Sequence, residues 1–307
     1  MEFMECINIR MKGVQTMKML YIDCFSGLSG DMTIGALLDA GGDFTHLQNE
    51  LKKLKIEDEY ELKLHKVNKN GITASKFDVI VKNESIHHEE GHHEEHHHEG
   101  HHHHDREHAH HHEHPHGKEH AHHHEHAHHH HDGHSHHHHR GYRDIVQMIE
   151  NSDLSANVKE ISLNMFKRIG EAEGKIHGVP LDDVHFHEVG AVDSIIDMVG
   201  VAILIEQLEI DVIKSAPVPT GSGHIHIDHG VYPVPAPATL EILKGVPVAT
   251  SELKAELTTP TGAAIASVLA EEFCAFPSME VRHIGYGAGT KTFPNHPNVL
   301  RVVIGSV

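Results

Sequence analysis

The stretch MLYIDCFSGLSGDM, residues 19–32, decides the class of fold. Its first seven residues form a short apolar run, which is typical of a buried strand. Small residues then form a turn, and a helix is expected from about Asp31 to Ala40, where Gly41 and Gly42 end it. The stretch therefore predicts a strand, a glycine-rich loop and a helix in direct succession.

The chain beyond this stretch continues to alternate between strands and helices. Two strands, at 60–67 and 72–81, flank the hairpin signal Asn70-Gly71. A helix is expected from 154 to 177, and the segment 195–208 is apolar nearly all round, as in a buried helix. This alternation predicts an α/β protein with a mixed sheet and flanking helices. Further expected elements are a helix at 143–150, loops at 217–223 and 233–237, helices at 238–244 and 262–272, and strands at 279–284 and 299–304.

A histidine-rich tract interrupts this pattern. Of the 41 histidines, 31 lie between His87 and His139, with Glu and Asp among them. The tract has almost no apolar side chains to bury, so we expect it to be disordered. Neutral imidazole binds Ni, Zn, Co and Cu, which favours a metal store over a solvated linker. The residues expected to hold stored metal include His101, His102, His103, His104, His128, His129, His130 and His131.

The tract also sets the expected division of the chain. An N-terminal extension (1–16) precedes the first part of the α/β domain (17–84). The disordered tract covers 85–140, and the remainder of the domain covers 141–307.

Composition excludes several classes of function. The formal charge of −20 argues against a nucleic-acid partner, which would need a basic face. The three cysteines form no CxxC pair, so neither a thiolate zinc site nor a disulfide framework is indicated. No signal peptide and no apolar run long enough to cross a membrane are present, so we expect a cytoplasmic protein without a membrane partner. The sequence leaves open whether it forms a homo-oligomer.

The loop between the first strand and the first helix is a candidate phosphate site. Backbone N–H groups of small residues at such a position can converge on a phosphate. Asp31 would hold a metal or orient a water as a catalytic residue. The alternative is that the glycines only make the turn and Asp31 only caps the helix. The phosphate-binding candidates are Ser26, Gly27, Ser29 and Gly30.

The segment His185-Phe186-His187-Glu188 is a candidate metal site. His185 and His187 point to one side of an extended chain. Asp193 and Asp197, four residues apart, share one face of the apolar helix and are costly there unless paired or bound to metal. Glu188 is the candidate proton acceptor. The alternative is that Asp193 caps the helix and Asp197 is satisfied in the core.

Two further segments carry polar groups in a meaningful pattern. His224, His226 and His229 lie in a strand and turn that also contain an aspartate, and they form a second candidate metal site, unless this is only a polar surface loop. Thr259 and Thr261 open a helix, where they either cap it or bind an anionic group.

The chain resembles the LarC family of nickel-insertion proteins. The resemblance is carried by the histidine-rich insertion and by YIDCFSGLSGDM (21–32), VHFHEVGAVDSIIDMVG (184–200), GSGHIHIDHGVYPVPAPATLEILKGVPV (221–248), ELTTPTGAA (256–264) and GYGAGTKTFPNHPNVLRV (285–302). It runs from about residue 17 to the end of the chain.

This resemblance implies a lyase-class nickel chelatase, or cyclometallase. Such a protein uses CTP, with Mg²⁺ or Mn²⁺, to insert Ni²⁺ into pyridinium-3,5-bisthiocarboxylic acid mononucleotide. The product is the nickel-pincer nucleotide cofactor of lactate racemase, which is the expected recipient. From the resemblance we also expect the family's C-terminal CTP-binding domain to be absent from this chain and a separately encoded domain to be a partner.

Two other functions fit the same residues. The first is nickel storage or delivery by a metallochaperone, without catalysis. The second is a metal-dependent phosphoester hydrolase that uses the histidines and carboxylates at 185–197. Conversion of the dithio-nucleotide to a nickel-containing product distinguishes insertion from both.

Overall fold

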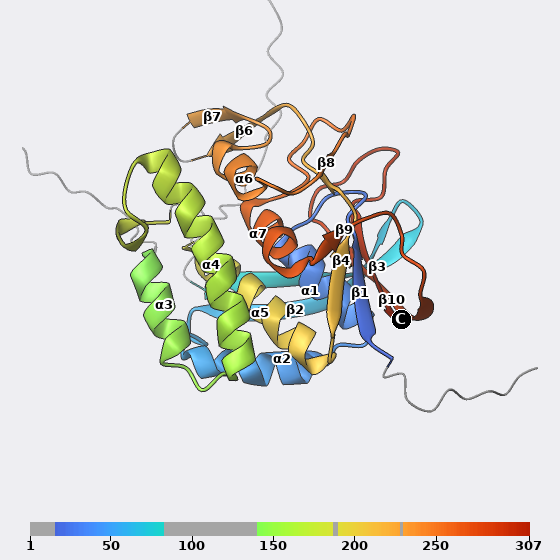
Figure 1. The fold of residues 1–307 in the computed structure, drawn as a ribbon, viewed down its shortest axis with the longest axis horizontal. Coiled ribbons are helices and arrows are strands. Elements are labelled where there is room, and N and C mark those ends of the chain that lie inside the picture. Colours follow the sequence, from blue (N-terminus) through green and yellow to red (C-terminus); the bar gives the residue numbers. More distant parts are fainter. Residues whose placement is uncertain (1–15, 83–139, 187–189, 228–229) are drawn as a thin grey trace, which may run out of the picture. The chain divides into compact units, whose positions relative to one another are not determined.

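The computed structural model describes residues 16–82, 140–186, 190–227 and 230–307, which belong to one compact unit of the chain (Figure 1). Most of the N-terminal extension (1–16) and nearly all of the histidine tract (85–140) lie outside these residues. So do the predicted ligands His187, His229 and the storage-tract histidines 101–104 and 128–131, together with the predicted proton acceptor Glu188.

A mixed sheet of seven strands forms the base of this unit, in the order β2-β3-β10-β11-β1-β4-β9. β1 lies between β11, which is antiparallel to it, and β4, which is parallel. The sheet thus confirms the predicted mixed α/β class. Its strands are β1 (Lys18–Asp23), β2 (Tyr60–Lys69), β3 (Ile72–Val81), β4 (Val212–Ser215), β9 (Glu272–Phe273), β10 (Glu280–Ala288) and β11 (Val299–Ser306).

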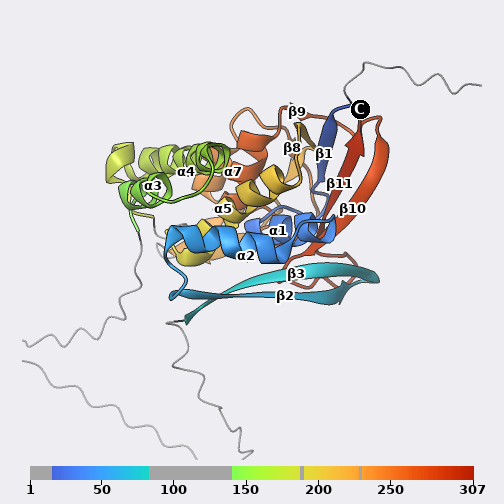
Figure 2. The ribbon, with the colours of Figure 1, turned by 90° about the horizontal axis from the view of Figure 1, so that it is seen from below.

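The helices pack in layers against the sheet. Figure 2 shows α1 and α2 over β2 and β3, with α5 beside α1 and with α3 and α4 farther from these strands. The helices are α1 (Gly30–Asp39), α2 (Phe44–Leu51), α3 (Tyr142–Glu150), α4 (Ala156–His177), α5 (Val192–Gln207), α6 (Pro237–Ile242) and α7 (Pro260–Leu269), with 3₁₀ turns at Lys52–Leu54 and Leu181–Asp183. Two small ladders, β5 (Val218–Pro219) with β8 (Val248–Ala249) and β6 (His224–Ile227) with β7 (Gly230–Pro233), complete the described elements.

Local sequence accounts for several helix boundaries. The side chain of Asp43 accepts hydrogen bonds from two backbone N–H groups at the start of α2. Ser155 caps α4 in the same way, and Gly178 ends it in the left-handed conformation. Helix α5 is buried along nearly its whole length, as its apolar sequence predicts.

Helix α1 lies unusually close to the sheet because glycines face it. A Cβ added at Gly287 would collide with the Met32 carbonyl, and one added at Gly285 with the Ala36 carbonyl. On the helix itself, Gly35 approaches the backbone of β3 in the same way. Glycine is the only residue that permits such contact between backbones. The pattern Gly-Tyr-Gly at 285–287 therefore positions α1, since alternate residues of a strand face the same side.

The structure corrects three expectations about elements. The segment 217–223, expected as a loop, contains the short strand β5, which pairs with β8. The helix expected over 262–272 ends at Leu269, and Glu272 enters β9, where it pairs with β4. Helix α2 and strand β4 were not anticipated, because their segments are short and their apolar residues few.

We predict that Gly287→Ala destabilises the protein by about 2–3 kcal/mol, the upper range for overpacking a well-packed contact. The added methyl group meets backbone atoms of α1, which cannot rotate away. Gly141→Ala is a suitable control, since its Cβ would meet no atom closer than 3.4 Å, and it is expected to cost less than about 1 kcal/mol. Urea unfolding of both variants measures the difference. Equal losses would contradict this account of α1.

Candidate active-site pocket

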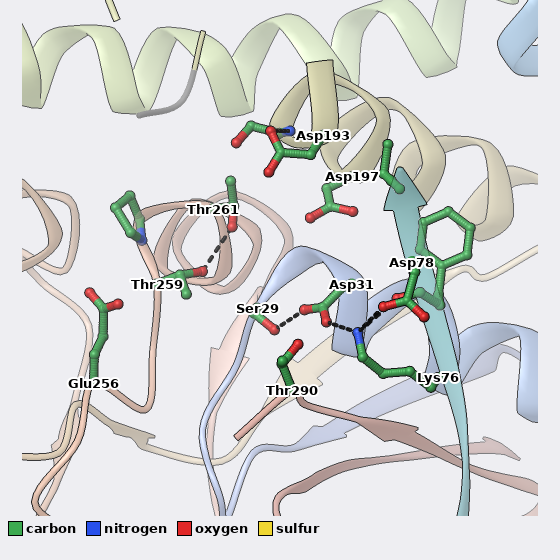
Figure 3. A pocket seen from close by; sticks show the side chains of 14 residues that line it. Ser29, Asp31, Lys76, Asp78, Asp193, Asp197, Glu256, Thr259, Thr261 and Thr290 are labelled. Atoms are coloured by element: carbon green, nitrogen blue, oxygen red, sulfur yellow. Dashed lines mark hydrogen bonds and ion pairs between the residues drawn. The ribbon is translucent and has the colours of Figure 1, made fainter. Parts of the chain in front are cut away.

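A pocket of about 400 Å³ lies where three helices begin. Figure 3 shows side chains from the first turns of α1, α5 and α7, together with side chains from β3, directed around one space. Each helix N-terminus carries a partial positive charge and backbone N–H groups without partners in the helix. The polar lining consists of Ser29, Asp31, Lys76, Asp78, Asp193, Ser194, Asp197, Glu256, Thr259, Thr261 and Thr290.

Lys76 joins the carboxylates on one side of the pocket. Its Nζ lies 2.8 Å from Asp31 Oδ2 and 2.9 Å from Asp78 Oδ1, and it donates to the Phe77 carbonyl at 3.0 Å. The Ser29 hydroxyl donates to the other oxygen of Asp31. Burial lowers the pKa of Lys76, but the two carboxylates outweigh it, so the pKa is raised. Lys76 is therefore a fixed cation, and its ion pairs hold Asp31 in place.

Asp197 has the least favourable surroundings in the pocket. Its Oδ1 is buried and has no hydrogen-bond partner among the described residues. Burial raises the pKa of this carboxyl well above its usual range, and the nearby charges of Asp31 and Asp193 raise it further. Lys76 and the backbone N–H of Asp31 act in the opposite direction and do not compensate. Asp197 is thus not the satisfied core residue of the alternative interpretation.

The positions of Asp193 and Asp197 confirm that the two carboxylates share a face. Both line the pocket from α5. Asp193 is not the N-cap, because Ala191 occupies that position and Asp193 is the second residue of the helix. Its side chain accepts the backbone N–H of Ser194 at 2.8 Å.

Thr259 and Thr261 line the pocket from the start of α7. The Thr259 hydroxyl accepts the Gly262 N–H at 3.2 Å, so Thr259 caps the helix. It also lies 2.8 Å from the Thr261 hydroxyl. Capping and lining the pocket are therefore combined in one residue.

In the loop at 26–31, some residues anchor the loop to its neighbours and others line the pocket. Ser26 is buried away from the pocket and donates to the Pro297 carbonyl at 2.6 Å. The N–H of Gly27 is bonded to the Cys24 carbonyl, so it is not offered to a ligand. Gly30 is the first residue of α1, and a Cβ there would overlap the side chain of Asp197. Only Ser29 and Asp31 of this loop line the pocket with their side chains.

The predicted histidine ligands that the structure describes lie elsewhere. His185 is exposed and forms a backbone bridge with Gly141. His224 and His226 are exposed on β6, which pairs with β7. None of the three lines the pocket. Within the described ranges, no group of three or more His, Cys, Asp or Glu side chains is arranged to hold a metal ion.

Sequence reasoning missed five polar residues of the pocket: Lys76, Asp78, Ser194, Glu256 and Thr290. For the first two a signal existed. They are two charged residues at alternate positions of strand β3, whose other residues are uncharged, so both side chains lie on the same side of it. Glu256 and Thr290 lie outside helices and strands, where no periodicity could reveal them.

We predict that Asp197→Asn stabilises the folded protein near pH 8. Because the carboxyl pKa is raised by folding, the unfolded chain loses this proton first, and stability falls as the pH rises above about 4. Asparagine cannot ionise, so the gain in Tm should be largest above the raised pKa and shrink toward pH 4. The exposed Asp58→Asn is the control without such a gain. A gain that is independent of pH would contradict this assignment.

The comparisons with known proteins agree on one family. The family model described as nickel insertion protein matches residues 20–307. Three curated relatives carry the name pyridinium-3,5-bisthiocarboxylic acid mononucleotide nickel insertion protein. That of Geobacillus kaustophilus is 50% identical over 94% of this chain and 60% of its own length. That of Clostridium kluyveri is 46% identical over 94% of this chain and 62% of its own length. That of Staphylococcus epidermidis is 43% identical over 93% of this chain and 59% of its own length.

The chain spans about three fifths of the length of these curated relatives. No solved structure matches it. None of the helices in the described ranges has the length and apolar character needed to cross a bilayer. The family model covers almost all of the chain outside its first residues. This chain therefore belongs to the nickel insertion protein family.

Proposed function

We propose that the pocket at the start of α1, α5 and α7 binds pyridinium-3,5-bisthiocarboxylic acid mononucleotide and that the protein inserts nickel into it. The observation that carries this proposal is the convergence of three helix N-termini on a carboxylate-rich pocket. Curated relatives of this chain are named as nickel insertion proteins for this nucleotide. Helix N-termini suit anionic groups of a nucleotide, and carboxylates suit cations. The two proposed substrates are an anionic nucleotide and the cation Ni²⁺, so the pocket offers suitable groups to each.

The size of the pocket supports a mononucleotide as ligand. Small-molecule sites commonly enclose about 300–1,000 Å³, and this one encloses about 400 Å³. The Thr259 and Thr261 hydroxyls share one hydrogen bond, so one of their two protons is left to donate to a phosphate oxygen. The Ser29 hydroxyl donates to Asp31, so it would donate to a phosphate only by exchanging that partner.

The chemistry we propose is a redox-neutral metallation. Nickel forms bonds to two thiocarboxylate sulfurs and to the ring carbon between them, and that carbon loses its hydrogen as a proton. Because the substrate supplies these three donor atoms, the protein does not need a complete ligand set of its own. This agrees with the lack of a three-ligand metal group within the described ranges. We infer a lyase-type chelatase on this basis.

CTP with Mg²⁺ or Mn²⁺, the family cofactor, belongs to the same proposal. Magnesium in nucleotide sites is usually held by one or two carboxylates together with phosphates. Asp31 fits that limited role, with the nucleotide phosphates supplying the other ligands. We assign CTP use to a protein of the relatives' full length, which includes a segment that this chain does not match. Delivery to lactate racemase in the cytoplasm completes the proposed sequence of events.

We also propose that the histidine tract concentrates nickel for the pocket. The 31 imidazoles between residues 87 and 139 offer many overlapping weak sites. Between the tract and the pocket, nickel has further candidate ligands, which are His185, His187, Glu188, His224, His226 and His229. The tract enters the chain between β3, which lines the pocket with Lys76, and α3.

An insertion assay tests the main proposal. The chain is assayed alone and joined to the segment of the Geobacillus kaustophilus relative that it does not match. Each is incubated with the dithio-nucleotide, Ni²⁺, CTP and Mg²⁺. We expect the joined protein to form a nickel-containing nucleotide, detected by mass spectrometry. Nickel binding without product, while the complete relative produces it, would leave storage as the function.

A deletion tests the role of the tract. Removing residues 87–139 should lower the number of Ni²⁺ ions bound at pH 7.5 and leave the Tm nearly unchanged, since loop length affects stability only weakly. In the intact protein this binding should weaken as the pH falls through about 6.5, when imidazoles protonate. Calorimetric titration measures both. An unchanged nickel stoichiometry after deletion would refute the storage role.

A further inference from the structure

The described lining of the pocket is rich in carboxylates and contains one ammonium group. Five carboxylates line it, whereas Lys76 is the single ammonium among its described lining residues. The Lys76 Nζ lies within 3 Å of two of these carboxylates, Asp31 and Asp78. Its three donors are therefore taken by Asp31, Asp78 and the Phe77 carbonyl, and none remains for Asp197. Asp197 lies on the side of the pocket formed by α5 (Figure 3).

Asp197 is the pocket carboxylate whose surroundings are least favourable to a negative charge. Its buried Oδ1 has no partner among the described residues. The partial positive charge of a helix N-terminus acts most strongly within the first turn. Asp197 is the sixth residue of α5 and lies beyond that turn. A buried polar atom without a partner destabilises the folded protein, and it does so more strongly when it is charged. A ligand that brings positive charge and a hydrogen-bond donor to this oxygen would remove that cost.

The proposed substrate carries both features on one edge of its ring. The pyridinium nitrogen is positively charged, and the ribose attached to it has a 2′-hydroxyl that can donate. The opposite edge carries two thiocarboxylates, which are anionic and are repelled by carboxylates. A nickel ion fits less well, because no group of three or more His, Cys, Asp or Glu side chains in the described ranges is arranged to hold a metal ion.

We propose that Asp197, supported by Asp193, recognises the pyridinium cation of the nucleotide. This inference rests on the proposed function and assigns an orientation to its substrate. The nitrogen edge of the ring faces α5, and the thiocarboxylate edge faces away from it. Nickel is then added at the edge farthest from Asp197. In this role Asp197 is a binding and specificity residue that selects a cationic ring over a neutral one.

A pair of probe ligands isolates the ring charge. Nicotinamide mononucleotide has a pyridinium ring, and its reduced dihydro form has a neutral ring of nearly the same shape. Neither binds nickel through thiocarboxylates, so the measurement is independent of insertion. We expect the wild-type protein to bind the oxidised form at least about 10-fold more tightly than the reduced form, as measured by calorimetry without metal. Equal affinities, or no binding of the oxidised form at millimolar concentration, would overturn the proposal.

Matched variants assign the preference to Asp197. Asp197→Asn keeps the shape of the side chain and removes its charge, so the preference for the oxidised form should fall to about 2-fold or less. Asp58→Asn removes the same charge from an exposed turn and should keep the full preference. Circular dichroism checks that both are folded. A preference that persists in Asp197→Asn would overturn the assignment.

The outcomes separate this inference from the proposed function. If insertion occurs but ring charge has no effect on binding, the nucleotide lies in another orientation and only the present inference fails. If ring charge controls binding but no nickel product forms, the pocket recognises pyridinium nucleotides for a different purpose. The wild-type ratio alone decides the first case, whether or not the variants fold.

Discussion

The close approach of α1 to the sheet is the constraint on which the pocket depends. Gly285 and Gly287 of β10 let the helix backbone contact the strand directly. At its N-terminus, Gly30 gives the same freedom toward Asp197 of α5. A side chain at any of these positions would push α1 outward and separate Asp31 from Lys76 and Asp197. Close backbone packing, which only glycine permits, therefore sets the geometry of the charged groups.

The pocket combines positive helix ends with carboxylates that oppose them. Asp31 and Asp193 lie in first turns, where a negative charge is favourable. Asp197 lies one turn further along α5, next to both, and has no comparable compensation. Such an unfavourable arrangement costs stability, and proteins retain it where a ligand supplies the missing charge. The pocket thus presents carboxylates on the side formed by α5 and hydroxyls on the side formed by α7.

Much of the fold followed from sequence pattern, and the gaps have physical reasons. The strand, loop and helix at 19–40 were predicted because a continuous apolar run, small turn residues and a double glycine leave few alternatives. The shared face of Asp193 and Asp197 followed from helical spacing. Lys76 was missed because its role depends on β3 lying beside α1. Ser26 and Gly27 were assigned to a phosphate loop, yet the structure uses their polar groups to anchor the loop to neighbouring backbone.

The α/β class, the boundaries of the long helices, the histidine-rich composition of residues 87–139 and the resemblance to a nickel-insertion family all followed from the sequence alone. These properties depend on composition and on neighbours within a few residues, so they can be read along the chain. Only the tertiary structure decided that Asp31, Asp197 and Thr261 surround one pocket, and that His185 and His224 do not. Residues separated by 64 to 230 positions meet there because three helices begin at one place. Proximity of that kind depends on how helices pack against a sheet, and no local pattern encodes it.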